Sequence, residues 1–255
     1  MTTTTLRLPP RIARLPHLRQ IVRGGLAARG SIGAGLAAKA GGAAAVPWYL
    51  AGGAPAPYAV WQPINAASLA ASYLRIAGAG GNANLDPAVV GSGVAPSFNT
   101  ATGWGLTAAS SQWLETGIAP VGGWSILIRV SSGPTSGNFC PLGVAISASV
   151  FFYSGAVFGN RYYASGSQYS PGAAVASAVF ATAGQQGYKD GVADGSVISG
   201  SGWTNAANRT LTIGKLGNNL STYYYTGNIL AVAIWDTSTN HATWMPAVMA
   251  ACALI

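Results

Sequence analysis

Hydrophobic and polar residues alternate along several short stretches of the second half of the chain, a pattern typical of strands with one buried face. In residues 123–130 the large apolar side chains recur at every second position, as Trp124, Ile126, Ile128 and Val130. Further strand-like stretches are residues 113–118, 144–153, 157–164, 175–183, 211–214 and 229–235. Turn residues separate them roughly every 8–12 residues, so the pattern predicts an all-β sandwich or barrel.

Two turns and one helix are predicted from local signals. Asp190-Gly191 lies between strand-like residues and is the strongest hairpin signal in the chain. A second turn is expected at Ser154-Gly155. The chain closes with a predicted short helix over residues 243–255, in which Thr243 would be the cap and Pro246 would lie in the first turn.

The pattern changes towards the N-terminus and divides the chain into three segments. Residues 1–45 form a basic Gly/Ala-rich anchoring arm, in which a short amphipathic helix is limited by three prolines. Residues 46–90 form a Pro- and aromatic-rich lead-in that we expect to be extended and to lie against the body or a neighbouring subunit. Within it, residues 66–76 fit a short helix or an edge strand equally well. Residues 91–255 form the β-sandwich.

Charge strengthens this division. The arm holds seven cations and no acid, because the first acidic residue is Asp86. The rest of the chain has six basic residues against five acids and is almost neutral. The arm cations, which we predict to be the assembly residues, are Arg7, Arg11, Arg14, Arg19, Arg23, Arg29 and Lys39. A Gly/Ala-rich basic segment has too few apolar side chains to fold alone, so the pattern favours an anchored module.

Composition limits the remaining possibilities. Only 7% of the residues are charged, so we expect partners to cover much of the surface and the chain to form a homo-oligomer. Cys140 and Cys252 are too few for a disulfide framework and are expected to be buried small hydrophobic residues. No stretch has the length of uninterrupted apolar residues that a membrane-spanning helix needs.

The order of several short motifs resembles the laminin-G-like, concanavalin-A-like jelly rolls. The motifs are WG at 104–105, LETG at 114–117, GWSI at 123–126, GYKDGV at 187–192, LTIGKLG at 211–217 and YTGNILAVAIWD at 225–236. The resemblance implies a jelly-roll β-sandwich with a short C-terminal helix. The segments at 47–53 and 66–72 are similar to the lead-in of phage-encoded versions, which implies a virion structural protein.

The sequence has few of the residues that catalysis or metal binding would need. Hydrolysis of a glycosidic bond normally needs two facing carboxylates, and Asp190 and Asp194 are the one close pair, both better explained as turn residues. The histidines are His17 in the arm and His241 before the terminal helix. Two histidines and two cysteines show no zinc-ligand spacing. We therefore expect no enzymatic activity, no metal site and no cofactor.

Three interpretations of the arm compete. It inserts into a neighbouring subunit or an acidic protein surface, it contacts nucleic acid with steep salt dependence, or it is a targeting peptide. We favour the assembly role over nucleic-acid contact, with other virion proteins of the capsid or tail as partners.

Clusters of tyrosine mark the body. They are Tyr162, Tyr163, Tyr169, Tyr223, Tyr224 and Tyr225. Tyrosine suits subunit interfaces, because it joins apolar area to a polar tip, and aromatic faces also stack on sugar rings. For these tyrosines we favour a subunit interface over a glycan site. Together with the resemblance to phage-encoded versions, this implies a virion protein that decorates a capsid or forms part of a tail or fibre. The alternative is a carbohydrate-binding module that recognises a host-surface glycan.

Overall fold

The chain divides into two compact units, Met1–Ala44 and Ala45–Ile255. The computed structural model describes parts of the second unit only. The described residues are 45–121, 123–136, 138–144, 153–155, 159–164, 167–169, 175–184, 186–195, 209–217 and 223–255. Residues 1–44 of the predicted arm, including its seven cations, lie outside them.

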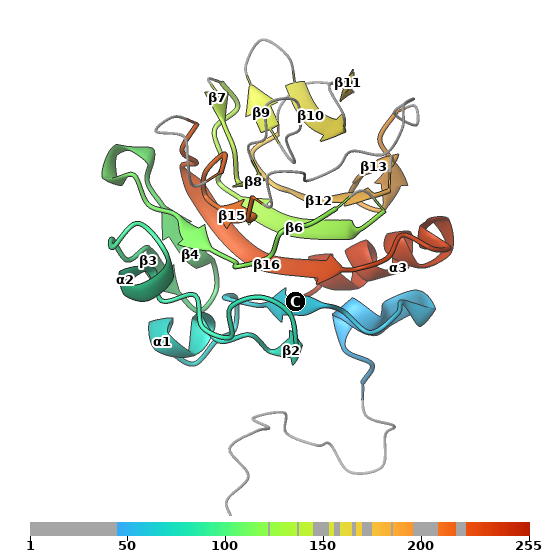
Figure 1. Ribbon diagram of the computed structural model, residues 1–255, viewed down its shortest axis with the longest axis horizontal. Helices are drawn as coiled ribbons and strands as arrows, with labels where there is room; N and C mark the ends of the chain where they lie inside the picture. Colours follow the sequence, from blue (N-terminus) through green and yellow to red (C-terminus); the bar gives the residue numbers. More distant parts are fainter. Residues whose placement is uncertain are drawn as a thin grey trace, which may run out of the picture. The chain divides into compact units, whose positions relative to one another are not determined.

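A nine-stranded sheet is the centre of the described fold (Figure 1). Its path runs β14 (Val192–Ala193), β13 (Gln186–Lys189), β12 (Ala178–Ala183), β6 (Ser125–Ser131), β16 (Gly227–Trp235), β1 (Ala59–Trp61) and β2 (Ala77–Gly78). Strand β4 (Gly103–Leu106) also pairs with β16, and β3 (Ser97–Asn99) pairs with β4. Every pair in this sheet is antiparallel. The chain is thus mostly β, as predicted.

Two smaller antiparallel sheets are also described. One has the order β5 (Leu114–Glu115), β15 (Thr212–Ile213), β8 (Leu142–Gly143). The other has the order β11 (Ser167–Tyr169), β10 (Gly159–Ala164), β9 (Tyr153–Gly155), β7 (Asn138–Phe139). Short helical segments connect the strands: η1 (Trp48–Gly53), α1 (Leu69–Ser72), α2 (Pro87–Val90) and η2 (Ala108–Ser110), and α3 (His241–Ala253) ends the chain.

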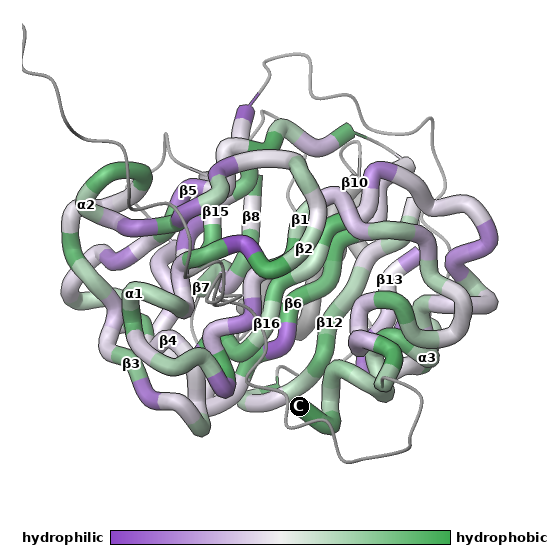
Figure 2. Tube along the Cα trace, turned by 90° about the horizontal axis from the view of Figure 1, so that it is seen from below, coloured by the Kyte–Doolittle hydropathy of each residue, from purple (hydrophilic) through white to green (hydrophobic). Residues whose placement is uncertain are grey.

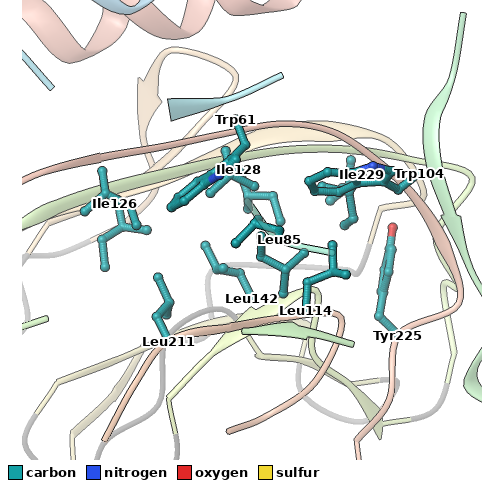
Figure 3. Packing of buried hydrophobic residues seen from close by; sticks show 14 of the residues in the cluster. Trp61, Leu85, Trp104, Leu114, Ile126, Ile128, Leu142, Leu211, Tyr225 and Ile229 are labelled. Atoms are coloured by element: carbon teal, nitrogen blue, oxygen red, sulfur yellow. The ribbon is translucent and has the colours of Figure 1, made fainter. Parts of the chain in front are cut away.

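The main core lies between the nine-stranded sheet and the sheet that contains β15. Ile126 and Ile128 of β6 lie on one side of it and Leu142 and Leu211 on the other (Figure 3). Trp124 packs against the edge of the same cluster. The predicted alternation of residues 123–130 is therefore confirmed, since its apolar positions share one face.

A second core covers the opposite face of the large sheet. Leu127 of β6 and Trp235 of β16 pack there with Trp244 and Met249 of α3. Because β6 and β16 are buried on both faces, they are apolar along most of their length, and much of both strands is green in Figure 2. Arg129 also faces α3, and its guanidinium donates to the carbonyl oxygens of Cys252 and Ile255 at 2.9 Å each, so it caps the end of that helix.

One irregularity decides which side chains of β16 face which core. The pairing of β16 with β6 shifts register between Ile229 and Ala231. Ile229 belongs to the main core, whereas Ala231 belongs to the core under α3. A regular strand would put both residues on the same face, so the extra residue, Leu230, makes a β-bulge that redirects the chain.

The lead-in segment supplies part of the sheet itself. Strand β1 pairs with β16 along Ala59↔Ile234 to Trp61↔Val232, and Trp61 is fully buried in the main core. The structure also resolves the alternatives left open for residues 66–76. They contain the short helix α1, and Ser68 caps it by accepting a hydrogen bond from the Ala71 amide at 3.1 Å.

The predicted Asp190-Gly191 turn is confirmed as the connection between β13 and β14. Both residues have positive φ, +50° for Asp190 and +84° for Gly191, which is the requirement of the tightest hairpin turns. The Asp190 carboxylate accepts a hydrogen bond from the Val179 amide at 2.8 Å and so ties the turn to β12. Asp190 is therefore a turn residue, as expected.

Gly191→Ala is expected to lower the free energy of unfolding by about 1–2 kcal/mol, because a side chain at positive φ is strained. Asp190→Asn is the control and should change it little, since asparagine tolerates this conformation and keeps an acceptor oxygen. Urea denaturation of both variants measures the difference. Equal stability of Gly191→Ala and the unmodified chain would contradict the turn assignment.

Three local predictions need correction, and one is confirmed. Ser154 and Gly155 lie inside β9 and pair with β10, so they do not form the turn. The C-terminal helix is present but begins at His241, with Asn240 rather than Thr243 at its cap. Pro246 therefore lies beyond the first turn and removes one internal hydrogen bond. Cys140 and Cys252 are buried, as predicted, and neither forms a disulfide.

Candidate functional site

The three consecutive tyrosines before β16 occupy three different environments. Tyr223 has φ +63°, a backbone conformation that a bulky residue rarely adopts. Its carbonyl accepts a hydrogen bond from the Cys140 amide at 3.1 Å. Tyr224 is half-buried, whereas Tyr225 is only 1% exposed. The sequence predicts Tyr223, Tyr224 and Tyr225 as one aromatic cluster, but the structure gives them different burial and different contacts.

Tyr225 is a core residue. Its ring lies 5.9 Å from that of Phe139 and joins the main core (Figure 3). A methyl group added at Gly133 or Gly227 would lie 2.6 Å from the Tyr225 hydroxyl oxygen, so these glycines form the slot that holds the ring. The hydroxyl has no hydrogen-bond partner in the described part of the chain, and burial raises its pKa. Tyr225 is therefore too buried to contact a ligand.

Tyr224 instead belongs to a cluster with Lys215 and Trp113. The Lys215 ammonium lies 5.1 Å from the ring centre of Trp113 and 5.2 Å from that of Tyr224, distances typical of cation–π contacts. Lys215 is 5% exposed, whereas both aromatic residues are half-buried. No local signal in the sequence indicated this cluster, because its members come from three separate segments.

The backbone around Lys215 fixes the position of its side chain. Lys215 follows β15, and the Thr212 hydroxyl donates to the Lys215 carbonyl at 2.7 Å. The same hydroxyl accepts from the Gly217 amide at 3.0 Å, so the turn after β15 closes on one side chain. The Trp113 amide donates to the Ser92 hydroxyl at 3.3 Å. The backbone at Lys215 and the backbone at Trp113 are thus each held by a hydrogen bond.

The remaining candidate tyrosines lie in the four-stranded sheet. Tyr162 of β10 is the direct register partner of Tyr169 of β11, and Tyr163 pairs with Gln168. Since neighbouring residues of a strand belong to opposite faces, Tyr163 is on the face opposite to Tyr162 and Tyr169. The side chains of these three tyrosines lie outside what the structure describes.

Two of the described acidic residues hydrogen-bond to backbone amides close to them in the sequence. The Asp86 carboxylate caps α2 by accepting from the Ala88 amide at 3.0 Å, and Glu115 accepts from the Gly117 amide at 3.4 Å. Asp236 is exposed after β16. No three His, Cys, Asp or Glu side chains gather as a metal-ion site within the described residues.

His241, the first residue of α3, makes one specific contact. The Tyr188 hydroxyl lies 2.8 Å from Nδ1 of His241, and the two rings meet edge to face at 5.7 Å. Burial raises the pKa of Tyr188, so its hydroxyl keeps its proton. The hydroxyl and the imidazole share one hydrogen bond, whose donor depends on the histidine tautomer. Burial lowers the pKa of His241, which favours its neutral form.

Stability is expected to fall as the pH falls through the ordinary range of histidine, near 6.5. The folded chain holds His241 with a lowered pKa, so the unfolded chain binds more protons there and acid favours unfolding. Urea midpoints at pH 5, 6, 7 and 8 measure the effect. His241→Gln should show a shallower dependence, since it removes the titrating group, and identical profiles for the two proteins would contradict this assignment.

No helix in the described segments is long and apolar enough to cross a membrane. No protein-family model matches the chain, and no curated protein sequence matches it.

Several solved structures have partial similarity to the chain. Domain 4 of AbnA, a GH43 extracellular arabinanase from Geobacillus stearothermophilus in complex with arabinotriose, is 14% identical with a TM-score of 0.43, over 58% of this chain and 75% of that one. Trypanosoma rangeli sialidase is 12% identical with a TM-score of 0.39, over 79% of this chain and 34% of that one.

A complex of the same sialidase with the inhibitor DANA is 14% identical with a TM-score of 0.36, over 50% of this chain and 23% of that one. The chain thus spans about a quarter to a third of the sialidases it matches. At these TM-scores the similarities support no argument about function. The described residues therefore establish a mostly β chain of antiparallel sheets that ends in a short helix.

Proposed function

We propose that the chain is a non-enzymatic structural protein of a virus particle, in which the basic arm anchors a laminin-G-like jelly roll. The observation that carries this proposal is the division of charge. The seven arm cations all belong to the unit Met1–Ala44, whereas Ala45–Ile255 has six basic residues and five acids. A nearly neutral body has few acids with which to hold such an arm, so the arm serves contacts with other virion proteins or other copies of the chain.

The arrangement of the motifs supports the jelly-roll part of the proposal. GWSI begins β6, YTGNILAVAIWD contains β16, and these two strands are neighbours in the large sheet. GYKDGV forms the β13–β14 hairpin at one end of the same sheet. Motifs that are far apart in the sequence therefore belong to one antiparallel sheet.

The positions of the acidic residues support a non-enzymatic role. Asp190 is one of the two carboxylates considered for hydrolysis. It is exposed at a hairpin turn, and its carboxylate accepts a hydrogen bond from the Val179 amide. The Asp86 carboxylate caps α2 by accepting a hydrogen bond from the Ala88 amide. The hydrogen bonds of these carboxylates to the backbone give both residues a structural role, so their presence needs no catalytic explanation.

Light scattering after size exclusion, across a salt series, tests the anchoring role. The full chain is expected to form a defined oligomer or to co-sediment with a particle, whereas residues 45–255 should be monomeric. A full-length variant with the seven arm cations changed to glutamine is the matched control and should behave like the truncation. If both proteins are monomeric and the full chain instead collects nucleic acid in a salt-sensitive way, the structural role is wrong.

A second candidate function is the recognition of a host-surface carbohydrate by the body. Half-buried Trp113 and Tyr224 favour it, because aromatic faces that remain partly exposed can stack on sugar rings. Loss of sugar binding on Tyr224→Ala would support this candidate. Tyr163→Ala tests the other predicted aromatic position in the same assay.

A further inference from the structure

We propose that one uncharged face of the body is a contact surface for a second copy of the chain. The face consists of residues 45–57 and 241–255, which contain η1 and α3, and it is called the α3 face below. The inference deepens the proposed structural role, because it names a surface through which copies held by their arms would meet. All residues of the face belong to the described body.

The two segments of the α3 face lie side by side. Helix α3, red in Figure 1, covers one side of the large sheet, and η1, in blue, lies against it. The contact is close, because a methyl group added at Gly52 would lie 2.5 Å from the side chain of Ala247. Trp48 of η1 and Trp244 of α3 also belong to the same buried core. The face is therefore one continuous surface formed by two elements.

The α3 face contains no Asp, Glu, Lys or Arg. On a helix that buries one side in a core, the opposite side is normally polar or charged. The exposed residues of α3 and of the turn that ends it are instead Ala242, Thr243, Ala250, Ala253 and Leu254. Leu254 is 88% exposed, and Val46 in the neighbouring segment is 67% exposed. Contiguous exposed apolar surface of this kind marks a site where another macromolecule binds.

The lack of charge identifies the occupant. A surface for nucleic acid or an anionic membrane needs cations, and this face has none. In a two-fold contact each copy presents the same surface, so a charged face would bring like charges together. The α3 face avoids that repulsion, and its histidine, His241, adds no charge near pH 7, because burial lowers the pKa of its imidazole. A second copy of the same face therefore fits it.

Charged side chains begin at the border of the face. Asp236 is exposed just before α3. Asp190 is exposed in the β13–β14 hairpin, and a methyl group added at its neighbour Gly191 would lie 3.4 Å from the Pro246 carbonyl oxygen. Protein–protein interfaces have this arrangement, in which charged residues are rare at the centre and polar residues form the rim.

The size of the face predicts a weak contact. A helix of 13 residues is about 20 Å long, and two elements packed side by side are about 20 Å wide. The resulting area of about 400 Å² per copy is about half of what a standard stable interface buries. Copies should therefore separate in dilute solution and pair through this face when they are concentrated or held together.

Cross-linking of cysteine variants of the full chain tests the contact. Ala250→Cys places a thiol on the exposed side of α3, and a short bis-maleimide joins two copies where these thiols meet. The native thiols do not compete, because Cys140 and Cys252 are fully buried. We expect covalent dimers from Ala250→Cys at high protein concentration. Val89→Cys is the matched control, because Val89 is 79% exposed on α2, outside the face, and it should give few dimers.

A second substitution shows whether the apolar surface drives the contact. Leu254→Asp, added to Ala250→Cys, should lower the yield of dimers at least about tenfold, because burial of the leucine is lost and like charges meet across the two-fold axis. Leu254→Met is its control and should preserve the yield. Since Leu254 is 88% exposed, neither change should unfold the chain.

Each outcome decides about the face or about the arm. Equal yields from Ala250→Cys and Val89→Cys, or no dimers from either, would overturn the self-contact. A thiol at position 250 that is shielded from the reagent without forming dimers would reveal a different occupant and would also overturn it. Cross-links in the variant whose seven arm cations are glutamine would support the self-contact even if light scattering shows that the anchoring role is wrong.

Discussion

Replacing Tyr225 by alanine is expected to lower the free energy of unfolding by about 3–5 kcal/mol, the range of large aromatic truncations in a core. The ring is 1% exposed and fills a slot between Gly133 and Gly227 in the main core. Its removal would leave a cavity beside β16 that the backbone of these glycines cannot fill. Urea denaturation, monitored by tryptophan fluorescence, measures the loss.

Tyr225→Phe is the matched control, and its expected result has the opposite sign. The Tyr225 hydroxyl is buried without a hydrogen-bond partner among the described residues. Because an unsatisfied buried hydroxyl costs free energy, the phenylalanine variant should be as stable as the unmodified chain or more stable by about 1 kcal/mol. A large loss of stability in Tyr225→Phe would show that the hydroxyl has a partner.

Replacing Trp235 by alanine is expected to cost about 3–5 kcal/mol through the other core. Trp235 is fully buried, its ring lies 5.1 Å from that of Trp244 on α3, and its indole nitrogen donates to the Pro55 carbonyl at 3.1 Å. One side chain therefore connects β16, α3 and the lead-in segment. Hydrogen exchange should show that α3 loses protection more than the main core does.

Two variants separate the contributions of Trp235. Trp235→Phe keeps a ring against Trp244 but removes the hydrogen bond to Pro55, so it should cost only about 1–2 kcal/mol. Trp124→Ala, at a half-buried position on the opposite face, should cost less than Trp235→Ala. An equal loss in these two alanine variants would contradict the second core under α3.

The candidate site could be predicted only in part. Tyr224 was among the six tyrosines selected from the sequence, because consecutive aromatic residues are conspicuous. Trp113 and Lys215 were not selected, since nothing in their immediate neighbourhood differs from an ordinary turn. Their contact depends on the packing of β5 beside β15, and a pairing between segments that are far apart has no local signal.

The sequence by itself determined the features that depend on local geometry. Alternation set the two faces of β6, positive-φ preferences set the Asp190-Gly191 hairpin, and a capping residue followed by a proline indicated a C-terminal helix. Each is a property of a few adjacent residues, because the side-chain period of a strand or the sterics of a turn acts over that distance.

Only the tertiary structure decided which segments meet. It made residues 59–61 a strand of the large sheet, through pairing with β16 more than 150 residues later. It also placed a β-bulge at Leu230, so that Ile229 packs in the main core and Ala231 packs in the core under α3. It separated the buried Tyr225 from the half-buried Tyr224, although the two are adjacent. The physical reason is that burial depends on the packing of distant elements, which no local pattern of residues specifies.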